Sequence, residues 1–129
     1  MNKILVEVSV GELLDKISIL EIKKEKIKES EKLQFINDEY KVLKDQLGKN
    51  VKSDEKIDKL FQSLKEINSK LWVIEDDKRL CEKNSDFSEK FIKLSRDVHF
   101  LNDDRAKIKL EINHHTGSKI KEIKEYTSY

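Results

Sequence analysis

The chain has 129 residues, of which 41% are charged, and its 27 basic and 26 acidic side chains leave a formal net charge of +1. This balance gives no overall field that would attract nucleic acid or anionic lipid, so neither is expected as a partner. The absence of proline and the presence of only three glycines favour long helices. The length fits one domain, and we expect a single helical-bundle domain over residues 1–129.

The distribution of cysteine and of apolar residues indicates the compartment. Cys81 is the only cysteine, which excludes an internal disulfide and is compatible with a reducing environment. The apolar run in the N-terminal MNKILVEV is too short for a signal peptide, and no apolar stretch is long enough to cross a bilayer. We therefore expect a soluble, cytoplasmic protein.

The first predicted helix has a readable start. Ser9 and Glu12 form an S-x-x-E capping box, in which each side chain accepts a hydrogen bond from a backbone amide of the other residue. Apolar residues then recur at helical spacing from Val10 to Ile27. Before this helix, residues 4–8 alternate apolar side chains weakly, as a short strand would.

Three further helical segments follow. The second carries apolar residues from Leu33 to Leu47 and is predicted to end at Gly48. The third begins at Ser53 or Asp54 and extends past residue 80. A turn around residue 85 then leads to a D-x-x-E cap, Asp86 with Glu89, at the start of the fourth helix.

These patterns predict a mainly all-α fold. Four segments with apolar residues at spacings of three and four indicate an antiparallel four-helix bundle with coiled-coil-like packing, in which the third and fourth helices form one long hairpin. The two chain ends could pair as a small two-stranded ribbon. In the alternative, the C-terminal segment is a frayed helical tail with Ile120 and Ile123 on one side.

One arginine occupies a position in the hydrophobic stripe of the fourth helix. The stripe is interrupted only at Arg105 and comprises Phe87, Phe91, Leu94, Val98, Leu101, Arg105, Ile108 and Ile112. A guanidinium keeps its charge and presents five donors, so burying it requires a carboxylate or a bound anion nearby. Arg105 is therefore the strongest functional indication in the sequence.

The hairpin geometry suggests two roles for Arg105. Residues at equal distances from the turn at residue 85 should lie side by side in the hairpin, which places Arg105 near Glu66. Matching the start of the first helix to the end of the fourth brings Glu12 and Asp15 to the same level of the bundle. Arg105 could form a buried pair with Asp15 or Glu66 that fixes the helix register. Alternatively, some of its donors could remain free for an anion, assisted by nearby lysines and amides.

A second cluster is predicted between residues 71–79 and 95–100. The same reflection places Arg96 near Glu75 and Trp72 near His99, where an indole and two arginines could stack a planar ligand, although tryptophan is more often a core or interface anchor. The candidate ligand-binding residues from both clusters are Glu12, Asp15, Lys16, Lys23, Arg79, Arg96, Asn102, Arg105 and Lys109.

No motif predicts a metal or a cofactor. His114 and His115 are adjacent, so on a helix they diverge by about 100° and cannot bind one ion together. The sequence contains no glycine-rich phosphate loop and no nucleophile elbow. We expect no cofactor, no metal site and no assignable catalytic residue.

Three stretches carry a family resemblance: SVGELLDKISILEIK at residues 9–23, LWVIEDDKR at 71–79 and LSRDVHFLNDDRAKIKLEIN at 94–113. Together they resemble a family of small bacterial and viral proteins classed as domain of unknown function family 6165. The resemblance spans nearly the whole chain and implies no activity or substrate. The residues that coincide with its distinctive positions are Gly11, Glu12, Asp15, Lys16, Asn102, Arg105 and Lys109.

Two functional hypotheses follow. The first is a non-enzymatic helical module that binds a partner protein or forms a homo-oligomer, with Trp72, Val73 and Phe100 as the candidate interface because they lie off the main stripes. The second is the binding of a small anionic ligand between the helices, with isomerase- or lyase-type chemistry as an extension if Glu12 or Glu21 acts as a general acid or base.

Overall fold

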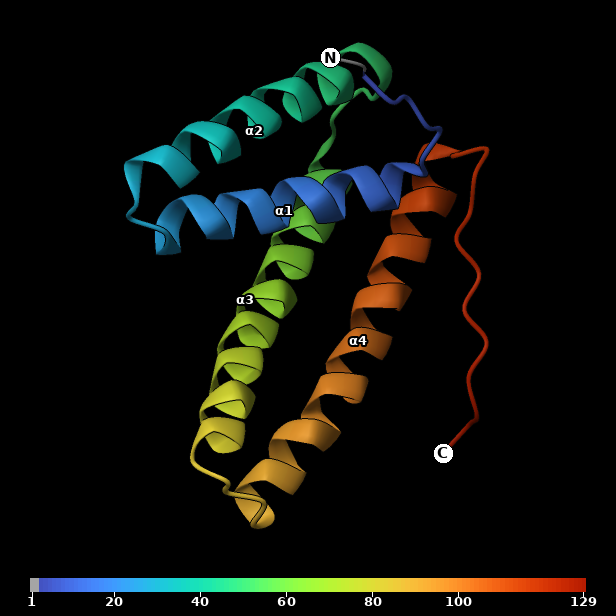
Figure 1. Ribbon diagram of the computed structural model, residues 1–129. Coiled ribbons are helices and arrows are strands. Elements are labelled where there is room, and N and C mark those ends of the chain that lie inside the picture. The colour runs from blue at the N-terminus through green and yellow to red at the C-terminus, as the bar shows by residue number, and fades with distance from the viewer. Residues whose placement is uncertain (1–2) are drawn as a thin grey trace.

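The computed structural model describes residues 3–129, in which four helices account for all the regular secondary structure. The helices are α1 (Val10–Lys26), α2 (Ser30–Asn50), α3 (Glu55–Lys83) and α4 (Glu89–Thr116). The predicted all-α bundle with a long third and fourth helix is confirmed. Helices α1 and α2 form one hairpin, which lies across the end of the longer α3–α4 hairpin (Figure 1).

The core lies where the two hairpins cross. Helix α1 packs against α2, α3 and α4, and α3 packs along α4. Leu14 of α1, Ile57 and Leu64 of α3 and Ile112 of α4 form the buried centre of this crossing. Because α1 contacts every other helix, it positions the polar side chains described below.

Two of the predicted helix starts are confirmed and one is displaced. Ser9 accepts a hydrogen bond from the Glu12 amide, and Asp54 accepts one from the Ile57 amide. The α4 cap is Ser88 rather than Asp86, because the Asp86 carboxylate accepts the Ser88 amide two residues ahead and forms part of the turn instead.

Helix α2 extends beyond its predicted end. Gly48 lies inside the helix, which ends at Asn50 with a hydrogen bond from the Val51 amide to the Leu47 carbonyl. Nothing packs within 4 Å of the position that a Gly48 side chain would take. A helix tolerates an internal glycine at a modest cost in stability. The prediction that α2 ends at Gly48 is therefore wrong.

The predicted ribbon of chain ends is wrong for the described residues, and so is the helical tail, because segments 3–9 and 118–129 form neither strands nor helices. The C-terminal segment turns at Gly117, whose φ is +67°, and returns along α4 (Figure 1). Two side-chain contacts hold this segment against α4: Glu122 with Lys109, and Tyr129 with Asp103. The segment is thereby kept apart from the N-terminal residues. Met1 and Asn2, which begin the segment examined for a signal peptide, lie outside the described residues.

Candidate functional site

Asp15 is a buried carboxylate at the junction of three helices, with 1% of its surface exposed. Its Oδ1 accepts hydrogen bonds from Arg105 Nε at 2.9 Å and from Asn68 Nδ2 at 2.8 Å. Its Oδ2 accepts one from Arg105 Nη2 at 2.5 Å and lies 3.8 Å from Lys109 Nζ. Arg105 thus binds Asp15 through two parallel hydrogen bonds, the geometry in which an arginine–carboxylate pair is strongest.

The surroundings of Asp15 stabilise its ionised form. Burial by itself would raise the pKa of this carboxyl group. The hydrogen bonds from Arg105 and Asn68, together with the charges of Arg105 and Lys109, outweigh burial and hold the pKa below its ordinary value. Asp15 is therefore an anion that cannot serve as a general acid at neutral pH.

Lys109 is the second buried cation, with 5% of its surface exposed. Its ammonium group lies 2.6 Å from Glu12 Oε2 and 2.8 Å from Glu122 Oε1. Burial would lower the pKa of Lys109, but these two hydrogen bonds and the charge of Asp15 outweigh it and raise the pKa. Two cations and three carboxylates are therefore paired across α1, α4 and the C-terminal segment, and Lys16, 3.8 Å from Glu12, is the cation nearest to the remaining negative charge.

The backbones of α1 and α4 approach closely beside this network. A side chain at Gly11 would place its Cβ 2.5 Å from the Lys109 carbonyl oxygen, so only glycine fits there. The Gly11 amide donates to Asn113 Oδ1 at 2.7 Å, and the Val10 amide donates to Ser118 Oγ. The start of α1 is thus seated on the last turns of α4.

The structure brings five of the predicted site residues together: Glu12, Asp15, Asn102, Arg105 and Lys109. Arg105 pairs with Asp15 rather than Glu66, which lies on the other side of the hairpin. Lys16 is at the margin, 3.8 Å from Glu12, and Lys23 forms no ion pair within residues 3–129. Arg96 lies apart, with its guanidinium 5.9 Å from the Phe100 ring.

Three members of the network were not predicted from the sequence, Ser18, Asn68 and Glu122, whereas Asn113 was expected with Asn102 as an amide beside Arg105. Asn68 follows Leu64 by four positions and precedes Leu71 by three, so it occupies a stripe position as Arg105 does. Asn113 continues the four-residue spacing of Arg105 and Lys109. Polar residues at core spacing were the available signal, whereas Glu122 lies in a segment whose weak alternation suggested a strand or a helical tail.

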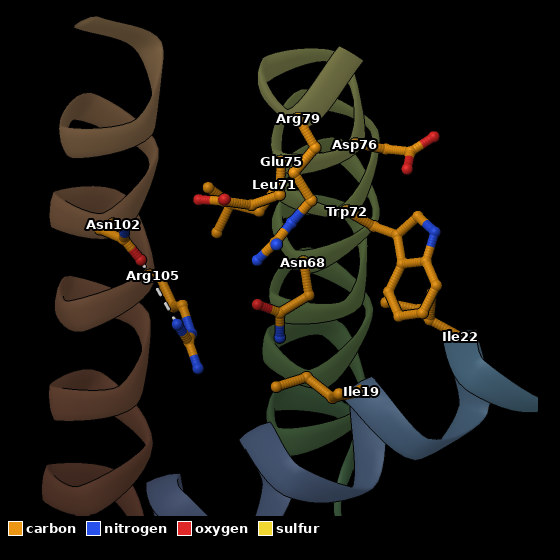
Figure 2. A pocket seen from close by; sticks show the side chains of 10 residues that line it. All are labelled: Ile19, Ile22, Asn68, Leu71, Trp72, Glu75, Asp76, Arg79, Asn102 and Arg105. Atoms are coloured by element: carbon orange, nitrogen blue, oxygen red, sulfur yellow. Dashed lines mark hydrogen bonds between the residues drawn. The ribbon is translucent and has the colours of Figure 1, made fainter. Parts of the chain in front are cut away.

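A pocket of about 400 Å³ opens beside the network, between α1, α3 and α4 (Figure 2). Its polar wall consists of Asn68, Glu75, Asp76, Arg79, Asn102 and Arg105. Its apolar wall consists of Ile19, Ile22, Leu71 and Trp72. Trp72 therefore lies in this pocket, whereas His99 packs against Phe100 and Tyr129.

The other two interface candidates lie in a separate groove between α3 and α4. Val73 and Phe100 line it together with Ile74 and Leu101. Trp72 does not line this groove, so the three candidates do not form one surface.

Two further observations concern the described part of the chain. Among these residues no three histidine, cysteine, aspartate or glutamate side chains are arranged to hold a metal ion. No described helix combines the length and the apolar character needed to cross a bilayer.

The fold and the charged network define an all-helical protein in which a cluster of ion pairs joins two crossed hairpins. The chain belongs to the family of unknown function DUF6165, whose model matches residues 4–129. No curated protein and no solved structure shows significant similarity to it.

Proposed function

We propose that this protein is a self-associating helical module, in which residues 73–100, the arm, pack against the arm of a second copy. The arm contains the turn of the α3–α4 hairpin, and Figure 1 shows this end of the hairpin projecting away from α1 and α2. A hairpin of two antiparallel helices is half of a four-helix bundle, and a second copy related by a two-fold axis would complete it.

The exposed surface of the chain carries this proposal. The accessible area is 9653 Å², whereas a compact monomer of 15.3 kDa is expected to expose about 7,100 Å². The excess exceeds the roughly 600–1,000 Å² that each partner buries in a stable interface. Both the arm and the extended terminal segments carry exposed apolar side chains, among them Leu80, Ile4 and Ile123, and association of the arms would remove part of this surface from water.

The groove between α3 and α4 has the chemistry of an interface. Val73, Ile74, Phe100 and Leu101 give it an apolar floor, and Val73 is 48% exposed. Leu80, one heptad after Val73, is also exposed and continues the apolar line along α3.

The charges beside this groove favour a second copy as the occupant. Lys70 lies on the groove together with the acidic Glu66 and Asp97. Lys70 and Asp97 lie at nearly the same level of the hairpin. When two hairpins pack groove to groove about a two-fold axis that runs along them, Lys70 of each copy can approach Asp97 of the other, so the same surface is complementary to itself.

Sedimentation velocity over a range of concentrations tests this proposal, with Val73→Lys as the disrupting variant. Placing an ammonium group in the apolar floor should weaken dimerisation at least about tenfold. Val42→Lys is the matched control, because Val42 is 60% exposed on α2, away from the arm. A wild-type monomer at high micromolar concentration would refute the proposal, as would equal effects of the two substitutions.

A further inference from the structure

The pocket beside Asp15 is lined by Asn68, a mostly buried residue whose side-chain oxygen accepts no hydrogen bond from a described residue and is open to the pocket. Asn68 is only 6% exposed, and its two amide hydrogens are donated to Asp15 Oδ1 and Ser18 Oγ, each at 2.8 Å. An ionised carboxylate only accepts hydrogen bonds, so the atom facing Asp15 must be the nitrogen. Asn68 Oδ1 is therefore the atom left for the pocket, and Figure 2 shows this oxygen on the side of α3 that faces α4. No described residue donates a hydrogen bond to it, so it can accept one from a ligand or from solvent.

Two guanidinium groups on the same pocket retain unused donors. Arg105 spends three of its five N–H groups on Asp15 and Asn102, which leaves one on each terminal nitrogen. Arg79, on α3, forms no ion pair with any described residue. Figure 2 shows its side chain extending along α3 from the upper turns toward Asn68. These groups together offer donors suited to one carboxylate.

The remaining walls restrict what could fill the pocket. Asp15 already offsets the charge of Arg105. Glu75 and Asp76 stand against the single further cation of the pocket lining, Arg79, so a phosphate or other polyanion would be repelled there. The same carboxylates and the free Asn68 oxygen suit a ligand that carries a cationic donor. Leu71, Trp72 and Ile22 supply an apolar wall for a hydrocarbon group.

We propose that this pocket binds a small zwitterion of the α-amino acid class with an apolar side chain. The ligand carboxylate contacts the free N–H groups of Arg105 and Arg79. The ammonium group donates to Asn68 Oδ1 and is attracted by Glu75, and the side chain packs against Trp72. A volume of about 400 Å³ lies at the lower end of the range of small-molecule sites, which suits a ligand of this size.

This site is independent of the proposed self-association. No residue lines both the pocket and the Val73 groove, and Lys16 and Lys109, predicted as anion ligands, do not line the pocket. Val73→Lys should therefore change the oligomeric state without changing ligand affinity. The two proposals can fail separately.

Tryptophan fluorescence gives a direct readout, because Trp72 is the only tryptophan of the chain and lines the pocket. The first probe is L-leucine, followed by L-valine, L-methionine and L-phenylalanine. Isocaproate lacks only the ammonium group of leucine, and isoamylamine lacks only its carboxylate. We expect saturable binding of at least one amino acid and, for leucine, at least about tenfold weaker binding of either analogue, since each loses a charged hydrogen bond.

Arg79→Met is the variant that tests the carboxylate contact. Arg79 is exposed and unpaired within the described residues, so the fold should persist, and affinity should fall about tenfold or more. Arg96→Met is the matched control, because it removes the same charge from α4 outside the pocket. The proposal is overturned if none of the four amino acids binds, if either leucine analogue or inorganic phosphate binds as tightly as leucine, or if the two variants lose affinity equally.

Discussion

Arg105 and Asp15 are separated by 90 positions in the chain, and their side chains meet in a two-hydrogen-bond ion pair that joins α4 to α1. The sequence left two carboxylates open as partners of Arg105. The geometry selects Asp15, which also binds Asn68 of α3. One buried carboxylate thus fixes the relative position of three helices.

Replacing Arg105 by Met should destabilise the protein by about 3–5 kcal/mol, because it leaves Asp15 as an anion in a buried site. Lys109, 3.8 Å away, compensates only in part. Urea unfolding followed by circular dichroism measures this loss. Combining Arg105→Met with Asp15→Asn should recover part of it, since the unpaired charge is then removed. If Arg105→Met costs no more than the exposed Arg79→Met, whose effect should stay within about 0.5 kcal/mol, the pair is not important for the fold.

Stability should fall in acid as Asp15 becomes protonated. The hydrogen bonds from Arg105 and Asn68 hold the folded-state pKa of Asp15 below the ordinary value of 3.8 that applies to the unfolded chain, so its contribution is present above 3.8 and is lost as pH falls through the lower, folded value. Urea midpoints measured over this range should fall less steeply for Asp15→Asn than for the wild type. Asp54 and Asp86, whose pKa values are also lowered, remain in the variant, so the difference between the two curves reports Asp15. Parallel curves would contradict this assignment.

Replacing Gly11 or Gly48 by alanine should change the stability of the protein in opposite directions. Gly11→Ala would place a methyl group against the Lys109 carbonyl and should cost about 1–3 kcal/mol, because the backbones of α1 and α4 must separate. Gly48→Ala meets nothing within 4 Å and should stabilise α2 by about 0.5–1 kcal/mol. Thermal unfolding of both variants tests the pair, and a neutral Gly11→Ala would show that the close approach is not maintained.

Glu122→Gln should loosen the C-terminal segment without affecting the helices. The substitution removes the charge that Lys109 binds at 2.8 Å, in a partly exposed ion pair worth up to about 1 kcal/mol. Trypsin cleavage after Lys121 or Lys124 should then accelerate, by up to about fivefold. Glu125→Gln is the control, because Glu125 has no ion-pair partner among the described residues. Equal cleavage of the two variants would indicate that Glu122 does not hold the segment.

Most of the fold follows from local signals in the sequence. Side chains at Ser9 and Asp54 satisfy free backbone amides, so these helix starts could be identified from a few neighbouring residues. The helix end predicted at Gly48 was wrong because a glycine marks a helix end only where the backbone adopts a left-handed conformation, as at Gly117. The course of the chain ends depends on contacts with α4, which no local pattern encodes.

The site was predictable in part for a similar reason. Arg105 stands out because a permanent charge interrupts an apolar stripe, which requires a compensating group. Reflection about the hairpin turn estimates levels along α3 and α4, but it does not say which side of the hairpin α1 crosses. Glu66 and Asp15 were therefore equivalent in sequence, and the separation of Trp72 from Val73 became visible only in three dimensions.

The position of α2 sets an order of unfolding. Ile36 is its single buried side chain, and α1 is the only helix whose backbone runs close to it. Local opening requires the least free energy where few apolar contacts must be broken, so the amide hydrogens of α2 should exchange with solvent before those of α1, α3 or α4. The smallest such opening releases α2 and leaves α1 seated on the long hairpin, held by Asp15, Arg105 and Lys109.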